Sequence, residues 1–403
     1  MNDYEFLNYV HPTIKEVSNL WEDIELLISG NRHLSFIARK HIRARLGESF
    51  EQYQDRLKRV TYSPVLSDTI RDLVKKLTTG SINVETPNFG DWVQTFDWVK
   101  LAGLLATDIL TYGRVLLTID EGGLKVLNPR QCVNYGEYED GSKWYLLSES
   151  VIVSSSPFEK AKRVVKYYLI DNEQITTYSK NDGVISEETQ LHGFNDTPIF
   201  YMIAPTEAHT ASAALSKCIQ HFVIENTIYE GAANLYVQRT FNKQLIPDDD
   251  LDDTYQLDTG NEHILLGDFQ FSEAAGTSIN TGLELLDVIK NEIKGIISTG
   301  SMSNSSKLSG MSGESRKFDY LDYSLTVANL GSLVLKAIRE VLEWLVQTTG
   351  ISGNVSASGF DIFEVDNLEY LLDVADRTLN HQESIDSEAL VSWYSKISNT
   401  LSK

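Results

Sequence analysis

The stretch Ile279–Thr349 decides the fold, and it reads INTGLELLDVIKNEIKGIISTGSMSNSSKLSGMSGESRKFDYLDYSLTVANLGSLVLKAIREVLEWLVQTT. In its first part, apolar residues recur every three or four positions, as the buried face of a helix requires. These residues are Leu283, Leu286, Ile289, Ile293, Ile296 and Ile297. The pattern predicts a helix over residues 279–297 that ends at Gly300.

The segment that follows, Thr299–Gly310, is rich in serine and glycine and has almost no side chain to bury. Small hydroxyl residues favour turns and mobile backbone over packed structure. Lys307 is the only charged residue of the segment. We therefore expect a loop that moves.

A second helix is predicted from Ser312 until Gly350, where glycine supplies a stop signal. Its apolar stripe comprises Phe318, Leu321, Leu325, Ala328, Ser332, Leu335, Ile338, Leu342 and Leu345. At ~1.5 Å per residue, such a helix is roughly 55 Å long. A helix of this length needs support, so we expect a large part of the protein to lie alongside it.

The composition is that of an ordinary globular protein, with 403 residues, 42% hydrophobic and 10% aromatic. There is no apolar run of about 18 residues, and the N-terminal Met1-Asn-Asp-Tyr-Glu5 is acidic. We therefore expect neither a membrane span nor a secretory signal, and synthesis in a cytosol. Cys132 and Cys218 lie far apart without metal-ligand spacing, which favours two buried thiols over a disulfide or structural zinc.

The formal charge of −22 makes tight binding of nucleic acid unexpected, because such affinity comes mainly from Lys and Arg on phosphates. The basic residues nevertheless cluster near the N-terminus, as Arg32, His33, Arg39, Lys40, His41, Arg43, Arg45, Arg56, Lys58 and Arg59. A solvated helix face is the simplest interpretation of this cluster. A contact with nucleic acid or with a scaffold protein is the alternative.

The N-terminal part to about Leu110 has helical periodicity, with breaks at Gly30 and Gly47. One stripe comprises Ile14, Val17, Leu20, Trp21, Ile24 and Leu27, part of another comprises Tyr53, Leu57 and Val60, and two further helices are expected over Val65–Leu77 and Trp92–Tyr112. Short runs rich in Val, Ile and Tyr follow and predict a mixed, largely antiparallel sheet. The runs are Arg114–Asp120, Leu124–Leu127, Lys143–Ser148, Val151–Val153, Val164–Ile170 and Gln174–Tyr178, with hairpin turns at Glu121-Gly-Gly and Glu139-Asp-Gly.

After Pro198 and Pro205, a long helix is predicted over Thr210–Tyr236, ending before Phe241. Residues 241–278 then form a compact insertion with strand-like Lys243–Ile246 and His263–Leu266. Beyond residue 350 we expect a strand pair and two closing helices, at Asn354–Val365, Leu368–Leu379 and Ser384–Leu401.

The motifs of common active sites give no convincing match. Asp258-Thr-Gly260 resembles the aspartic-protease triplet, but Asn261 stands where a small Ser or Ala is usual. The run Asp248–Asp253 begins like a calcium loop, but Asp253 replaces its turn glycine and Thr259 its bidentate glutamate. There is no phosphate loop, nucleophile elbow or HExxH zinc motif. His11, His192 and His209 are most simply surface or cap residues. We expect no metal, no cofactor and no enzymatic activity.

Two groups of short motifs frame the chain. The N-terminal group comprises His11-Pro12, Trp21, Gly30, Tyr53-Gln-Asp-Arg-Leu-Lys-Arg59 and Tyr62. The C-terminal group comprises Gly295-Ile-Ile-Ser-Thr-Gly300 and Ser312-Gly-Glu-Ser-Arg316. With two helices around an insertion, a polar loop and a long helix, this order resembles the portal proteins of tailed bacteriophages. The resemblance spans nearly the whole chain.

The resemblance implies an α+β fold with a defined succession of parts. These are a wing over 1–205 (helical 1–112, β-rich 113–205), a first stem helix over 206–240, a small α/β clip over 241–278, a second stem helix over 279–298, a tunnel loop over 299–311, a long wing helix with a strand pair over 312–366, and a short helical crown over 367–403. The short C-terminus departs from larger portals, whose helical barrel extends into the capsid.

The resemblance also implies a ring, usually of twelve subunits, at one capsid vertex of the virion, assembled in the host cytoplasm. A terminase drives double-stranded DNA inward through such a ring, and the DNA later leaves into the tail. Further partners are the major capsid protein, the scaffold and a tail adaptor. The implied DNA-facing residues of the tunnel loop are Ser301, Asn304, Ser305, Ser306 and Lys307. The implied clip residues that face terminase or adaptor are Asp248, Asp249, Asp250, Asp252 and Asp253.

The acidic charge is compatible with such a channel, because acidic walls repel phosphate and let DNA slide without tight binding. Two alternatives remain. One is a soluble acidic hydrolase that resembles an aspartic peptidase and uses Asp258, which predicts a compact monomer or dimer with a pocket. The other is a smaller head–tail connector, which would lack the helix–insertion–helix arrangement.

Overall fold

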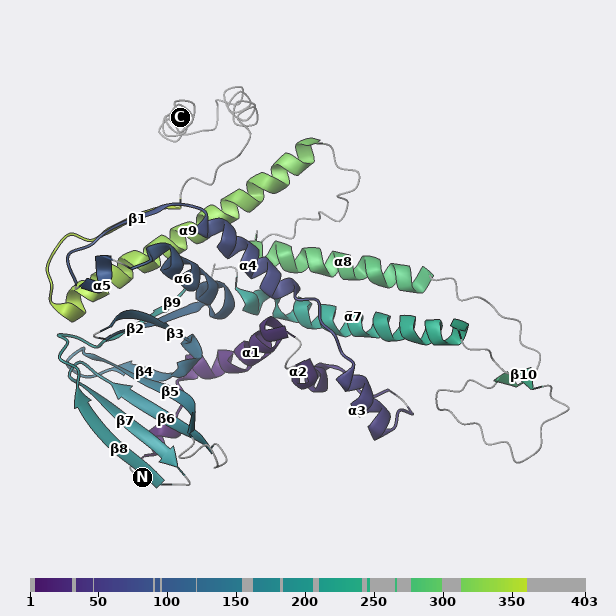
Figure 1. Cartoon of the computed structure of the whole chain (residues 1–403), viewed down its shortest axis with the longest axis horizontal. Helices are drawn as coiled ribbons and strands as arrows, with labels where there is room; N and C mark the ends of the chain where they lie inside the picture. Colours follow the sequence, from purple (N-terminus) through teal and green to yellow (C-terminus); the bar gives the residue numbers. More distant parts are fainter. Residues whose placement is uncertain are drawn as a thin grey trace. The chain divides into compact units, whose positions relative to one another are not determined.

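The computed structural model describes residues 4–30, 34–45, 47–89, 91–94, 96–120, 122–153, 162–181, 184–205, 210–240, 245–246, 265–266, 277–298 and 313–360. These residues form a mixed α and β protein (Figure 1). The chain divides into residues 1–360 and residues 361–403, and all of the described residues belong to the first unit.

The N-terminal part is helical, as predicted. After a short 3-10 turn at Glu5–Asn8, its helices are α1 (Pro12–Ser29), α2 (Leu34–His41), α3 (Phe50–Lys58), α4 (Val65–Thr78), α5 (Asp91–Gln94) and α6 (Trp98–Tyr112). The predicted α1 stripe is buried at Ile14, Trp21, Ile24 and Leu27, whereas Leu20 is exposed.

Two details of this helical part differ from the prediction. The expected single helix Trp92–Tyr112 is two helices, because the side chain of Asp97 accepts a hydrogen bond from Lys100 N and so begins α6 separately. Val60 lies beyond the end of α3 and does not extend its apolar face.

The β part forms two antiparallel sheets rather than the single sheet expected. The first has the order β3-β2-β9 and the second β4-β5-β6-β7-β8. The strands are β2 (Arg114–Asp120), β3 (Gly123–Leu127), β4 (Cys132–Glu137), β5 (Lys143–Val153), β6 (Lys162–Ile170), β7 (Gln174–Asn181), β8 (Val184–Leu191) and β9 (Ile199–Ile203), with a 3-10 turn at Pro129–Gln131 before β4.

Both expected hairpins are confirmed, since β2 pairs with β3 and β4 pairs with β5. The runs 143–148 and 151–153 belong to one strand, β5. Three strands of these two sheets were not anticipated. β8 is largely polar, β9 lies between two prolines, and β4 is interrupted by an irregularity in its register between Cys132 and Asn134.

A buried arginine joins the helical part to the first sheet. Arg114 opens β2 and is 6% exposed. Its guanidinium donates to Thr13 O of α1 at 2.9 Å and to the Tyr201 hydroxyl of β9, and it lies 5.2 Å from the centre of the Trp21 ring. A buried charge is tolerated only with such partners, so these contacts fix α1 against the sheet.

The long helix is confirmed as α9 (Gly313–Thr349), and Gly350 follows it with a φ of +70°. The predicted face is buried at Leu335, Ile338, Leu342 and Leu345, but Ser332 is exposed. Val327, Leu330, Val334, Ala337 and Val341 widen the buried face. A broad face of this kind matches the position of α9, which packs on α4, α6 and β9.

The strand pair expected over Asn354–Val365 is described only up to residue 360, and its remaining part lies outside the described residues. Within the described part, only β12 (Ser356–Gly359) forms, and its antiparallel partner is the distant β1 (Ile82–Glu85). Arg339 of α9 donates two hydrogen bonds to Ala357 O, at 3.0 and 2.8 Å. Gly359 has a φ of +124°, and a Cβ there would lie 2.2 Å from Ser81 O. A backbone contact of this kind cannot be anticipated from local sequence.

The helices on either side of the insertion are α7 (Ala211–Thr240) and α8 (Thr277–Ser298). Between them, β10 (Leu245–Ile246) and β11 (Leu265–Leu266) pair in parallel, at the positions predicted to be strands. The rest of the insertion, the loop at 299–311 and the closing helices beyond residue 366 lie outside the described residues. Within the described part of the chain, no helix has both the length and the apolarity that crossing a bilayer requires.

Helix α6 is largely buried, and Asp108 is the only carboxylate between its bounds, Trp98 and Tyr112. Among the described residues its Oδ2 has no hydrogen-bond partner. Burial raises the pKa of Asp108 to about 7, because the ionised form loses hydration without gaining a counter-ion.

We predict that Gly359→Ala destabilises the protein by about 1–3 kcal/mol, because the backbone conformation favours glycine and the nearest atom is a main-chain oxygen that cannot turn aside. Gly231→Ala is the matched control. Gly231 lies within α7 with no atom within 4 Å of an added Cβ, so alanine should stabilise by about 0.5–1 kcal/mol. Denaturant unfolding measures both, and equal effects of the same sign would contradict the prediction.

We predict that Asp108→Asn is more stable than the wild type at about pH 8, and that the difference shrinks toward about pH 4. The folded-state pKa of about 7 lies above the ordinary 3.8, so the folded protein holds the proton more tightly than the unfolded chain. Stability is therefore lost as the pH rises through this window, and a neutral amide avoids the loss. Thermal unfolding of both proteins across this range measures the effect, and a difference independent of pH would refute it.

Candidate functional site

The helix pair α7–α8 is the candidate site, because it carries the insertion and has both a buried and an exposed part. Figure 1 shows the two helices side by side, and they run antiparallel. Near the base, Lys217 Nζ lies 2.6 Å from Glu292 Oε2. Further out, a Cβ at Gly282 would lie 2.8 Å from Ile228 Cδ1, so glycine allows the helices to approach closely.

The base of the helix pair is part of the protein core. On α7, Ala214, Leu215, Cys218 and Phe222 are buried. On α8, the predicted residues Ile289, Ile293 and Ile297 are buried, against α4 and α9. Roughly 1.5–3 kcal/mol per fully buried large aliphatic side chain holds this end in place.

A buried carboxylate, Glu225 on α7, fixes the helix to the connection between α3 and α4. Glu225 is 2% exposed and accepts hydrogen bonds from Ser63 N at 3.0 Å and from Ser63 Oγ at 2.5 Å. One turn earlier, His221 Nδ1 lies 3.7 Å from Glu225 Oε2, and burial lowers the pKa of His221 against the opposing pull of that carboxylate. This pair was not predicted from the sequence, although an acid and a histidine four residues apart in an apolar run were a signal for it.

Asn226 and Glu230 extend this attachment along α7. The Asn226 side chain accepts from Thr61 N at 2.9 Å and donates to Thr61 O at 2.8 Å. Arg45 lies 2.6 Å from Glu230, and Arg56 lies 2.6 Å from Glu48 and 3.9 Å from Glu230. The Arg56 hydrogen bond lowers the pKa of Glu48 to about 2, so this carboxylate stays ionised.

Part of the basic cluster therefore has a structural role that was not predicted from the sequence. Arg45 and Arg56 attach α2–α3 to α7, and Lys40 lies 2.6 Å from Asp23 of α1. Arg39, Arg43 and Arg59 are exposed, as the solvated-face interpretation predicts, whereas Arg32 and His33 lie outside the described residues.

The outer part of the helix pair exposes large apolar side chains. Tyr229 is 53% exposed, Leu283 45%, Leu285 44% and Val288 38%. Leu283 was predicted to belong to the buried stripe of its helix, so the prediction fails toward the outer end. Grouped apolar exposure of this kind marks a contact surface more often than scattered exposed residues do.

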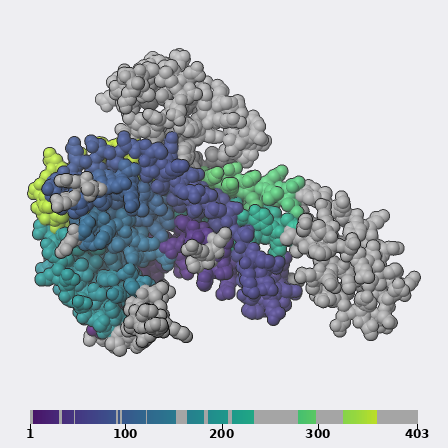
Figure 2. Space-filling model, in the orientation of Figure 1, coloured from purple at the N-terminus to yellow at the C-terminus, as the bar shows by residue number. Residues whose placement is uncertain are grey.

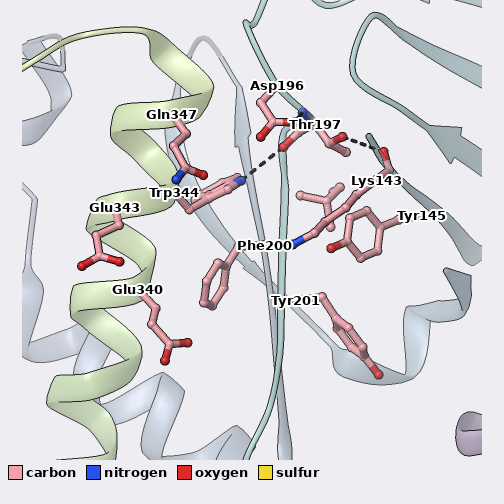
Figure 3. Close-up of a pocket in the computed structure, with 11 residues that line it drawn as sticks. Lys143, Tyr145, Asp196, Thr197, Phe200, Tyr201, Glu340, Glu343, Trp344 and Gln347 are labelled. Carbon is pink, nitrogen blue, oxygen red and sulfur yellow. Dashed lines mark hydrogen bonds between the residues drawn. The ribbon is translucent and has the colours of Figure 1, made fainter. Parts of the chain in front are cut away.

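A cavity of about 250 Å³ lies between α9, β5 and β9 (Figure 3). Asp196, Glu340, Glu343 and Lys143 contribute charged groups, and Trp344 Nε1 donates to Thr197 O at 3.2 Å. The Thr197 hydroxyl in turn donates to Lys143 O at 2.7 Å. Among the described lining residues there is no serine, cysteine or histidine, and the one threonine hydroxyl is engaged by the main chain. The contacts join α9 to both sheets.

The residues that the resemblance assigns to the tunnel loop, Ser301, Asn304, Ser305, Ser306 and Lys307, lie outside the described residues, as do the clip aspartates 248–253 and Asp258. No group of three or more potential metal ligands occurs among the residues that the structure describes. Cys132 and Cys218 are buried free thiols, as predicted, and burial raises the pKa of each to about 12. His11 begins α1 as its cap, also as predicted.

Comparison with known proteins gives matches only among solved structures. No protein-family model matches the chain, and no curated protein does. The neck of a native gene transfer agent particle, computed with C12 symmetry, contains a chain with 13% identity and a TM-score of 0.41, over 90% of this chain and 94% of that one. A chain in the virion of the native gene transfer agent particle has 13% identity and a TM-score of 0.42, over 89% of this chain and 98% of that one. The neck of an empty gene transfer agent particle, computed with C6 symmetry, contains a chain with 13% identity and a TM-score of 0.41, over 90% of this chain and 94% of that one.

Proposed function

We propose that this protein is a portal-like subunit that assembles into a ring around a channel for double-stranded DNA. The observation that carries the proposal is the helix pair α7–α8, which has its base in the core and large apolar side chains exposed on its outer part. The long helix α9 and the opening sequence motifs add to the resemblance to phage portals.

The energetics of the exposed side chains favour assembly. Leaving Tyr229, Leu283, Leu285 and Val288 in water forgoes about 25 cal/mol per Å² of apolar surface. A neighbouring copy that covers them recovers this free energy, and repetition of one contact around an axis closes a ring. Asp258, on which the catalytic alternative depends, lies outside the described residues.

Within this proposal, residues 241–278 form the clip, and Asp248–Asp253 face the terminase during packaging and a tail adaptor afterwards. A dense group of carboxylates increases the rate and specificity of docking to a basic partner. Thr299–Gly310 forms the tunnel loop, where hydroxyl groups and Lys307 make weak, transient contacts with DNA phosphates. The net charge of −22 keeps the DNA from binding tightly to the channel.

We predict that electron microscopy of the purified full chain shows closed rings with a central hole. Native mass spectrometry should give one oligomeric mass or a narrow set, because ring closure limits the number of heterologous contacts. Monomer alone across a wide concentration range would contradict the proposed function, and a compact dimer with a pocket would favour the hydrolase alternative.

We predict that deletion of Ser301–Ser309 leaves ring assembly intact and impairs DNA packaging or retention. The segment cannot supply a core, so its loss should cost little stability, whereas a channel contact would be lost. Lys307→Ala is the milder control and should have a smaller effect on packaging. The loop assignment fails if the deletion dissolves the ring, or if the length and yield of packaged DNA stay unchanged.

A further inference from the structure

Two different surfaces lie on opposite sides of α7. Lys217 and Ile228 face α8, whereas Asn226 contacts Thr61, just after α3, and Glu230 contacts Arg45, between α2 and α3. At about 100° per residue, these two pairs point to opposite sides of the helix. Figure 1 shows the same order, with α8 on one side of α7 and α2 and α3 on the other, and in Figure 2 atoms of α8 (green) and of α3 (dark blue) lie on the viewed face.

The first surface, the α8 face, consists of Leu283, Glu284, Leu285, Asp287 and Val288, all exposed. It combines three large apolar side chains with two carboxylates. The basic residues of α8, Lys290 and Lys294, lie nearer to its base. The outer half of the helix is therefore apolar and acidic.

The second surface, the α2–α3 face, consists of Phe36, Arg39, Arg43 and Phe50. Phe36 and Phe50 are 58% and 76% exposed, and the tyrosine hydroxyl of Tyr53 in α3 donates to Ile42 O at 2.8 Å, which joins the two helices. Residues 34–59 contain seven Lys or Arg and three Asp or Glu, in a chain of charge −22. Arg39 and Arg43 form no ion pair with the described residues. This face is apolar and basic.

We infer that the α8 face of one subunit docks on the α2–α3 face of the next copy of this chain. A ring requires a heterologous contact between two different patches of the same subunit. These two faces are matched in apolar character, opposite in charge and placed on opposite sides of α7. The inference rests on the proposed ring, and it assigns the surfaces that close it.

The charge distribution favours a second copy over DNA as the partner of the basic face. Phosphate contacts need Lys and Arg but no large apolar side chains, whereas Phe50 is the most exposed large apolar residue described. The α8 face supplies apolar surface to cover the phenylalanines of the α2–α3 face and carboxylates to pair with its arginines. Any other placement of two neighbouring copies would bring like charges together, which would disfavour it.

Cysteine cross-linking of the full chain tests the contact. Val288→Cys and Phe50→Cys in one chain, treated with a short bis-maleimide, should give a ladder of dimer, trimer and larger covalent species. Each single variant should give no ladder, because one cysteine alone does not face its copy across a heterologous contact. The buried Cys132 and Cys218 should leave the wild type unlinked. The control pairs Val288→Cys with Leu191→Cys, since Leu191 is 73% exposed on β8, and should also give no ladder.

Two results would overturn the inference. Dimers from Phe50→Cys or Val288→Cys alone would show an isologous contact, and absence of a ladder from the double variant in protein that forms rings would show that other surfaces close the ring. In the second case the proposed function stands. Absence of rings from the wild type instead refutes the proposed function itself.

Charge reversal gives an independent readout. Arg39→Glu with Arg43→Glu, or Glu284→Arg with Asp287→Arg, should each weaken subunit association by at least about tenfold, and the combined variant should recover association. The loss should be greater at low salt than at high salt. Rings that stay intact in the arginine variants while DNA retention is lost would assign the basic face to DNA and reject the subunit contact.

Discussion

The hydrogen bonds between the buried Glu225 carboxylate and Ser63 are the interaction on which the arrangement of this protein depends. A carboxylate that is 2% exposed is tolerated only when its oxygens are satisfied, and Ser63 supplies both a backbone and a hydroxyl donor. The bonds fix where α7 leaves the core. The close approach of α7 and α8 at Gly282 lies further along the helix pair from that starting point.

The ion pairs around Glu230 determine the side of α7 on which the α2–α3 part lies. Arg45 and Arg56 hold the α2–α3 part to one side of α7, which leaves α8 to occupy the other. Partly buried pairs contribute modest free energy, but the Arg56 pair with Glu48 lowers the carboxyl pKa to about 2 and so persists over the physiological range. The basic cluster of an otherwise acidic chain thus has two roles, internal attachment through some residues and an exposed surface through others.

The exposed apolar side chains connect this geometry to function. Burial is nearly complete at Ile289, Ile293 and Ile297 and decreases toward Leu283 on the same helix. No described element of the chain covers the outer end of α8. The apolar periodicity of the helix nevertheless continues beyond the part that the core of the chain buries. A pattern of this kind is expected for a helix whose outer part is buried by another copy.

The sequence by itself determined where most helices and several strands lie, because apolar periodicity, glycine stops and proline breaks act within a few residues of one another. It placed α1, α4, α7, α8 and α9 within a few residues of their observed bounds, and the buried thiols as well. It did not determine the pairing of β12 with β1, since that depends on the approach of Gly359 to Ser81 across most of the chain.

Only the tertiary structure decided which polar residues are buried and which apolar residues are exposed. The periodicity of α8 gives Leu283 and Ile293 the same apparent role, yet one is exposed and the other is buried, because neighbouring elements cover only the base of the helix. Glu225 and Arg56 are of residue types that usually lie at the solvated surface, yet here they hold the helix pair in place. Burial is a property of the assembled elements, and local sequence specifies only the face that is available for it.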